Sequence, residues 1–238
     1  NGCGFQATET RIQPQKRWTE PGEFKFFYPL DKSEDPENKA YVNIAWLTCD
    51  ITQNRDMLAM ALLERVLLGD DSYPLRKALL DSGLGTAVSI CGFEYEFKDT
   101  FFTCGLRGMR EKDARQLEKL VLATLAGLAK NGLPRDLIEA ELHQMKFQLK
   151  EIKKTRFPYG FNLALGLMGQ WIHESDPLRV LDIDADLGYL ENKIQDGPFL
   201  EQKLKQFLLD NPHRALIVVA PDREMVDEFE ARVKQELA

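Results

Sequence analysis

The 238-residue chain carries 38 acidic and 31 basic residues, which gives a formal net charge of −7 at pH 7. Nucleic acids bind basic surfaces, so this balance argues against nucleic acid as a general partner. Lys146 to Arg156 is the one candidate for a local basic patch. No stretch approaches the roughly 18 apolar residues that a membrane helix needs, so we expect no membrane partner.

Four cysteines, Cys3, Cys49, Cys91 and Cys104, are scattered along the chain without a CxxC pair. A domain of this size needs no disulfide framework, so free thiols and a reducing compartment are favoured. The chain begins at Asn1 without an initiator Met or a signal peptide, and we therefore expect a piece of a longer polypeptide.

Residues 1–17 are polar and aperiodic, and we expect a linker or disordered tail before a single domain over residues 18–238. In the first half of that domain, aromatic and β-branched runs predict strands, and apolar residues at helical spacing predict helices. Thr52 is the predicted N-cap of the first helix, and Lys98-Asp99 is the predicted turn of a hairpin. The predicted elements are strands at Phe24–Pro29 and Ala40–Leu47, helices from Thr52 to Gly69 and from Pro74 to Gly83, hairpin strands at Thr86–Phe97 and Thr100–Gly108, and a helix at Glu111–Lys130.

The second half is predicted to be helical up to Arg214–Ala220, a continuous apolar run typical of a strand that is buried on both faces of a sheet. Strands do not alternate one-for-one with helices, which disfavours a doubly wound parallel sheet. We predict an α+β fold, with a mainly antiparallel sheet of about five to six strands and helices packed on one face. The predicted helices are Arg135 to about Thr155, Phe161–Ile172, Pro177–Ile194, Phe199–Leu208, and one from Pro221 to the C-terminus.

The three histidines, His143, His173 and His213, are far apart in the sequence. A zinc hydrolase site needs two histidines one helical turn apart and a glutamate as base, as in HExxH or HxxEH. Their positions instead predict a surface or half-buried His143 with Glu139 one turn before it, a His173 that caps a helix C-terminus, and a His213 in a turn. No GxSxG motif marks a serine nucleophile. We therefore predict no catalytic, cofactor-binding or metal-binding residue in this chain.

Two further patterns have structural explanations. Gly83-Leu-Gly85 precedes a strand, so it predicts the end of a helix and a turn rather than a phosphate-binding loop. Asp182, Asp184 and Asp186 alternate as at the start of a calcium loop, but the glycine and the closing glutamate of such a loop are missing. These three aspartates predict a solvated helix start.

The chain also carries an ordered set of short motifs. They are Ala45-Trp46-Leu47, Ala61 to Glu64 with Leu67 to Asp70, Ser72 to Leu75, Lys77 to Gly85, Phe102 to Gly108, Ile138 to Ala140 with Leu142-His143-Gln144, Phe157-Pro158 with Gly160-Phe161, Trp171 with Asp176-Pro177-Leu178, and Leu208 to Arg214. In this order and at these spacings, they resemble the second domain of the presequence-protease branch of the insulinase (pitrilysin) family of zinc metallopeptidases. The resemblance covers roughly Trp18 to Ala238. Lys146 departs from it, because relatives often have an acidic residue there, which puts in doubt an interface salt bridge of that helix.

The resemblance implies a parent protein of about four homologous α+β domains around a closed peptide-digesting chamber. The first domain of such a protein holds zinc through an inverted HxxEH motif, and the second forms chamber wall and inter-domain interface. None of the family's zinc ligands or catalytic bases maps onto this sequence, so the fragment alone is expected to be inactive and to need no cofactor. The implied partners are sister domains of the same polypeptide and unstructured peptide substrates of the parent. The implied location is the bacterial cytoplasm, with the mitochondrial matrix or a plastid as alternatives.

One alternative stays open, a scaffolding or core-type subunit of a processing peptidase complex without peptidase activity of its own. An independent enzyme with an unrecognised site is disfavoured by the missing histidine pair and nucleophile. Unstructured peptides can be bound by backbone pairing with a sheet edge. If this domain contributes such an edge, Ala40–Leu47 is the candidate strand.

Overall fold

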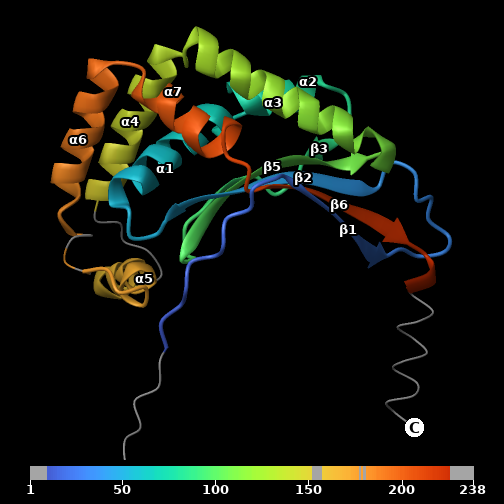
Figure 1. The fold of residues 1–238 in the computed structure, drawn as a ribbon, viewed down its shortest axis with the longest axis horizontal. Helices are drawn as coiled ribbons and strands as arrows, with labels where there is room; N and C mark the ends of the chain where they lie inside the picture. The colour runs from blue at the N-terminus through green and yellow to red at the C-terminus, as the bar shows by residue number, and fades with distance from the viewer. Residues whose placement is uncertain (1–9, 152–156, 177, 179–180, 226–238) are drawn as a thin grey trace, which may run out of the picture.

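The computed structural model describes residues 10–151, 157–176, 178 and 181–225. In these residues a six-stranded sheet carries helices on one face, which confirms the predicted α+β architecture (Figure 1). The strands are β1 (Gly22–Pro29), β2 (Ala40–Asp50), β3 (Ala87–Val88), β4 (Gly92–Glu94), β5 (Asp99–Met109) and β6 (Arg214–Asp222). The helices are α1 (Asn54–Leu68), α2 (Pro74–Asp81), α3 (Ala114–Asn131), α4 (Arg135–Lys150), α5 (Tyr159–Trp171), α6 (Ile183–Asp196) and α7 (Phe199–Leu204), with a short 3₁₀ helix η1 (Glu111–Asp113) and a π-helix η3 (Lys205–Leu209).

The strand order is β1-β6-β2-β5-β3, and β4 also pairs with β5. The sheet is mixed, because β1 pairs with β6 in parallel while the other pairings are antiparallel. The prediction that Ala40–Leu47 forms an exposed edge is wrong, since β2 is paired with β5 on one side and with β6 on the other. The C-terminal strand β6 inserts between β1 and β2, and this leaves β1 at the edge.

The core lies between the sheet and the helices. Val42, Ile44 and Trp46 on β2 point into it and are fully buried, and Trp46 meets Phe102 of β5 at a ring-centroid distance of 6.0 Å. Each such large apolar side chain contributes roughly 1.5–3 kcal/mol when it is fully buried. In β6 the buried residues alternate with half-exposed ones. The prediction that this strand is buried on both faces is therefore wrong, because helices cover one face of the sheet only (Figure 1).

Most predicted elements are confirmed, and the differences lie at their ends. The predicted N-cap Thr52 is wrong, because α1 begins after Gln53 and the Thr52 hydroxyl donates to Asp50 at 2.7 Å. Helix α6 begins at Ile183 rather than at Pro177. Residues 152–156, 177, 179–180 and 226–238, where parts of three predicted helices fall, lie outside the described residues. The predicted start of the last helix at Pro221 is wrong, because β6 continues through Pro221 to Asp222.

The predicted hairpin is less regular than expected. Its first strand is divided into β3 and β4, because the thiol of Cys91 accepts the Gly105 N–H at 3.2 Å where a ladder bond would stand. The predicted two-residue turn is also wrong. Asp99 is already the first residue of β5, and the Lys98 ammonium binds the Asp50 carboxylate at 2.9 Å.

Candidate interaction surface

The three histidines occupy different environments. His143 is exposed on α4, as is Glu139 one turn before it, which confirms the predicted surface pair. His173 follows the end of α5 and donates its backbone N–H to the Gln170 carbonyl at 3.1 Å. His213 lies in the turn before β6, as predicted, but its side chain is buried. In the described part of the chain, no group of three or more His, Cys, Asp or Glu side chains could hold a metal ion.

The described cysteines are free thiols with little reactivity. Cys49 and Cys104 are buried and Cys91 is half-buried. Burial raises the pKa of Cys49 and of Cys91 to about 11, and it raises the pKa of Cys104 well above the ordinary thiol value. Because the thiolate is the reactive form, these residues act as small apolar side chains. Cys3 lies outside the described residues.

The glycine prediction is confirmed, and the prediction for the aspartates is confirmed in part. Gly83 follows α2 with a φ of 65°, so it ends the helix with a left-handed turn. Asp184 is exposed near the start of α6, as expected. Asp186 is buried instead and binds Arg55 at 3.2 Å, because α6 packs against α1.

In its described part, the predicted basic segment forms ion pairs with neighbouring acidic residues. Lys146 binds Glu191 at 2.5 Å, and Lys150 binds Asp184 at the same distance, so α6 neutralises this side of α4. Residues 152–156, the remaining basic part of Lys146 to Arg156, lie outside the described residues.

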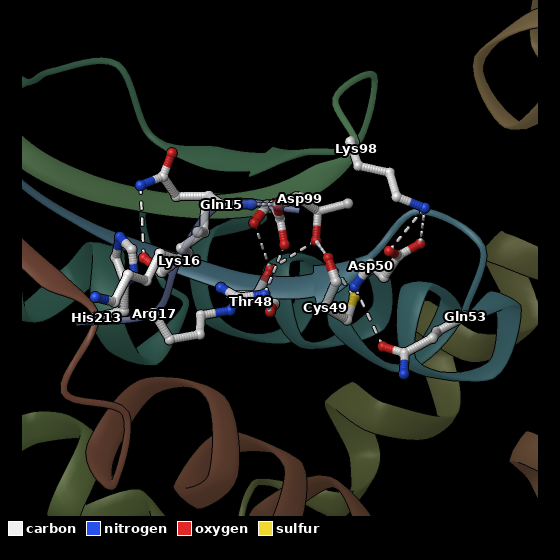
Figure 2. A network of polar contacts seen from close by, with 12 residues as sticks. Gln15, Lys16, Arg17, Thr48, Cys49, Asp50, Gln53, Lys98, Asp99 and His213 are labelled. Atoms are coloured by element: carbon white, nitrogen blue, oxygen red, sulfur yellow. Dashed lines mark hydrogen bonds and ion pairs between the residues drawn. The ribbon is translucent and has the colours of Figure 1, made fainter. Parts of the chain in front are cut away.

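A polar network ties the segment before β1 to the sheet (Figure 2). Asp99 is buried and accepts two hydrogen bonds, from the Gln15 backbone N–H at 2.7 Å and from the Arg17 guanidinium at 2.8 Å. Arg17 also donates to the Thr48 carbonyl at 2.9 Å. These polar groups bind backbone atoms or an opposite charge. The arrangement is therefore structural, and it contains no nucleophile–base pair.

Trp18 and His213 also attach the segment before β1 to the domain. Their rings stack with a centroid distance of 4.2 Å and an interplanar angle of 9°. The Trp18 backbone N–H donates to His213 Nδ1 at 3.1 Å, which requires that nitrogen to be unprotonated. Burial and the nearby Arg17 charge lower the pKa of His213, so the neutral acceptor form is favoured.

The most conspicuous surface feature is helix α5, which has no buried residue although it is the most apolar of the helices in the described residues. In Figure 1 it lies apart from the layer of helices above the sheet. Such an apolar element outside the core is typical of a docking surface. Its exposed large apolar side chains are Tyr159, Phe161, Leu165, Met168 and Trp171.

An open groove of about 810 Å³ separates α5 from α1, the end of α4 and the residues after β4. Three acidic residues, Glu64, Glu96 and Asp186, also line it. Burial raises the pKa of the Glu64 carboxyl, and the hydrogen bond from the Phe93 N–H partly offsets this effect. The apolar lining of the groove comprises Ile51, Met57, Leu58, Ala61, Phe93, Tyr95, Met145, Leu149, Leu165, Met168, Ile172 and Ile183.

A second open apolar surface is the face of the sheet that the helices leave uncovered (Figure 1). The register places Phe26, Val219 and Tyr41 side by side on this face across β1, β6 and β2. Phe24 and Ile217 form a parallel row next to them. Neighbouring side chains in such rows pack together and expose a continuous apolar strip.

The match to a known family decides the identity of this fold. A family model described as the peptidase M16 inactive domain matches residues 4–145, which is more than half of the chain. The chain belongs to the peptidase M16 inactive-domain family. M16 is the insulinase-type class of metallopeptidases, so the resemblance found in the sequence is confirmed.

Curated relatives of this M16 domain are much longer proteins. It is 30% identical over 232 residues to a mitochondrial presequence protease of Xenopus laevis, covering 96% of this chain and 22% of that protein. It is 31% identical over 229 residues to the chloroplastic and mitochondrial presequence protease 1 of Arabidopsis thaliana, covering 94% of this chain and 21% of that protein. A bacterial relative is the protein HypA of Clostridium perfringens, at 28% identity over 233 residues, covering 98% of this chain and 24% of that protein. The chain spans about a fifth of the length of these relatives.

Solved structures share the fold of this M16 domain. A peptidase M16 inactive domain from Pseudomonas fluorescens superposes with a TM-score of 0.61 at 15% identity, covering 89% of this chain and 46% of that one. A protease from Helicobacter pylori gives a TM-score of 0.58 at 14% identity, covering 92% of this chain and 50% of that one. At such identities the likeness shows the fold alone.

The sequence of this M16 domain predicts the candidate surface only in part. The apolar run Phe161–Ile172 was found, but nothing in its pattern distinguished an exposed helix from a buried one. The Arg17–Asp99 pair joins positions 82 apart in the chain, and no local signal could have revealed it.

Proposed function

We propose that this M16 domain is a non-catalytic structural domain of a zinc-dependent metalloendopeptidase that degrades unstructured peptides. In that protein it forms part of the chamber wall and docks against sister domains of the same polypeptide. Residues 1–17 are a linker or a disordered tail, and the single domain over residues 18–238 contributes no catalytic or zinc-binding residue. The zinc belongs to another domain of the parent.

The exposed apolar helix α5 carries this proposal. A stable monomer rarely exposes a continuous apolar surface, and a domain taken out of a larger assembly exposes its former interface. The family match and the small share of each relative that the chain covers support the same conclusion. No helix among the described residues is long and apolar enough to cross a membrane. For the parent protein we propose the bacterial cytoplasm, with the mitochondrial matrix or a plastid as the alternative.

A complementation assay tests the proposal. The chain alone, and the chain mixed with the remainder of its parent protein, are assayed for bound zinc and for cleavage of an unfolded peptide. We expect no zinc and no cleavage from the chain alone, and cleavage from the mixture. A chain that binds stoichiometric zinc and cuts the peptide by itself refutes the proposal, and so does a remainder that is fully active without the chain.

Two variants locate the contact. Met168→Glu with Trp171→Glu places two charges on α5, where both side chains are exposed, and should reduce complementation by about tenfold or more. Phe97→Glu places one charge on an exposed aromatic position outside the groove and serves as the control. Equal losses from both changes would show that α5 is not the docking helix. Full complementation by the α5 variant would show the same.

A further inference from the structure

The groove between α5 and α1 contains a carboxylate whose position is held by the fold. Glu64 lies on α1 and is half-buried in the wall of this groove of about 810 Å³. Its carboxylate accepts the backbone N–H of Phe93. The backbone of Gly92 approaches it so closely that a Cβ there would lie 2.8 Å from Glu64 Oε1. These contacts orient the carboxylate before any partner binds.

No described Lys or Arg forms an ion pair with Glu64. Arg65 lies nearby, but its guanidinium contacts Gln148 at 2.6 Å and Glu141 at 3.7 Å. Burial raises the pKa of the Glu64 carboxyl, so its charged form is poorly solvated. Glu96 also lines the groove and has no ion pair among the described residues, whereas the third acidic residue of the groove is already paired with an arginine. Two unpaired carboxylates favour an occupant that brings a positive charge into the groove.

The walls of the groove determine what backbone its occupant can have. Most of the lining belongs to α1, α4 and α5, and backbone N–H and C=O groups inside a helix are already paired. An extended segment buried between these apolar walls would therefore leave its own backbone groups unpaired. A helix pairs its own backbone groups and buries only side chains. Helix α5, with 13 residues, is about 20 Å long and can lie alongside about three turns of such a helix.

We propose that the groove binds an amphipathic helix of a sister domain, and that a Lys or Arg of this helix pairs with Glu64. The apolar face of the helix packs against Leu58 and Ala61 on one wall and against Leu165 and Met168 on the other. The choice of a sister domain as the source of the helix rests on the proposed function. The need for a cation and for a helical backbone rests on the groove itself.

A second copy of this chain fits the groove less well. The exposed apolar helix that a second copy offers is α5, and its sequence from Tyr159 to Trp171 contains no Lys or Arg that could pair with Glu64. Each copy also carries a net charge of −7, so two copies repel one another. A sister domain with a basic amphipathic helix meets neither obstacle.

The affinity of the chain for the remainder of its parent protein tests the role of the carboxylate. Titration calorimetry compares the unsubstituted chain with Glu64→Gln, which keeps an acceptor for the Phe93 N–H and removes only the charge. We expect Glu64→Gln to raise the Kd by about tenfold or more, because hydrogen bonds between charged partners are about twice as strong as neutral ones. Glu139→Gln is the matched control, since Glu139 is exposed on α4 outside the groove, and should change the Kd by less than about twofold.

A second pair of variants tests the apolar wall without changing any charge. Ala61→Phe fills the groove from α1 and should raise the Kd by about tenfold or more, because the added ring occupies the place of the incoming helix. Ala126→Phe makes the same change at an exposed position of α3 and should leave the Kd within about twofold. Circular dichroism of all four variants checks that the fold is intact.

Hydrogen exchange of the remainder identifies the helix. We expect one helical segment with a Lys or Arg to become protected by the unsubstituted chain and not by Ala61→Phe. Replacing that Lys or Arg by Glu and combining it with Glu64→Lys should restore the Kd to within about threefold of the unsubstituted pair, since the two charges are exchanged.

Several results would overturn the proposal. They are an unchanged Kd for Glu64→Gln, equal losses from Glu64→Gln and Glu139→Gln, protection of a non-helical segment, no recovery in the charge exchange, and a dimer in sedimentation that Ala61→Phe dissociates. If the remainder binds and complements Glu64→Gln as well as the unsubstituted chain, the pairing at Glu64 is wrong and the proposed function stands. If the remainder does not bind the unsubstituted chain at all, the proposed function fails together with this proposal.

Discussion

Replacing Arg17 by alanine probes how the segment before β1 is attached to the domain. The Arg17 guanidinium reaches the Asp99 carboxylate at 2.8 Å and the Thr48 carbonyl at 2.9 Å. The Asp99 side chain is only 8% exposed, and without Arg17 its remaining partner is the Gln15 N–H. The substitution therefore leaves a buried carboxylate with half of its hydrogen bonds.

The expected loss of stability follows from the geometry of this pair. Removing one partner of a fully buried ion pair costs about 3–5 kcal/mol. The Arg17 side chain is 43% exposed, so water screens the pair and can partly replace the guanidinium, which reduces the loss to about 2 kcal/mol. For a chain of this size, such a loss lowers the Tm by about 4–8 °C.

A double-mutant cycle with urea denaturation measures this coupling. The cycle combines Arg17→Ala with Asp99→Asn, which keeps an acceptor for the Gln15 N–H, and should give a coupling energy of about 1–2 kcal/mol. Arg76→Ala is the control, because its pair with Asp71 has the same distance of 2.8 Å but the Asp71 side chain is 76% exposed, and should cost less than about 1 kcal/mol. A coupling near zero, or equal losses from both arginines, would refute the reasoning.

Three further predictions concern titration, packing and thiol chemistry. Folding lowers the pKa of His213 below its ordinary value of 6.5, so stability should fall as the pH drops through 6.5 toward the folded-state pKa, and His213→Gln should flatten that part of a thermal unfolding profile. Gly105→Ala should cost about 1–3 kcal/mol in urea unfolding, because a Cβ there would lie 2.1 Å from a carbonyl oxygen of β2. Gly127→Ala is the control for this packing prediction, because its position on α3 has open space around it, and it should stabilise by about 0.5–1 kcal/mol. With a pKa of about 11, Cys49 and Cys91 should be alkylated at pH 8 roughly a hundredfold more slowly than an unperturbed thiol, and denaturation should remove that protection.

Each of these arguments has a result that contradicts it. If His213→Gln leaves the pH dependence of thermal unfolding unchanged, protonation of His213 is not the cause of the loss of stability at low pH. A Gly105→Ala variant with the same free energy of unfolding as the unsubstituted chain would mean that β2 and β5 can move apart without a cost in stability. Alkylation of the native chain as fast as in urea would show that burial does not protect the thiols.

Local patterns were sufficient to predict most of the secondary structure. The alternation of Val42, Ile44 and Trp46 matches the buried face of β2, since side-chain direction in a strand has a period of two. Apolar residues at helical spacing likewise located α1 and α3, because one face of each helix is in the core. These features depend on neighbouring residues only, and so the sequence expresses them directly.

The order of the strands could not be predicted in this way. Strand β6 was recognised as an apolar run, but its place between β1 and β2 depends on pairing with segments almost the whole chain length away. The choice of Ala40–Leu47 as the edge failed for this reason. A strand's hydrophobic pattern tells which face is buried and does not tell which neighbours it has.

The candidate surface likewise has features that the sequence predicts and features that depend on tertiary contacts. The sequence by itself determined an α+β domain of the M16 type, without the histidine pair of a zinc hydrolase. Only the tertiary structure decided that α5 is exposed, that β1 is an edge and that Asp99 holds Arg17. Burial and long-range pairing depend on which distant segments come into contact, and local composition carries little information about these contacts.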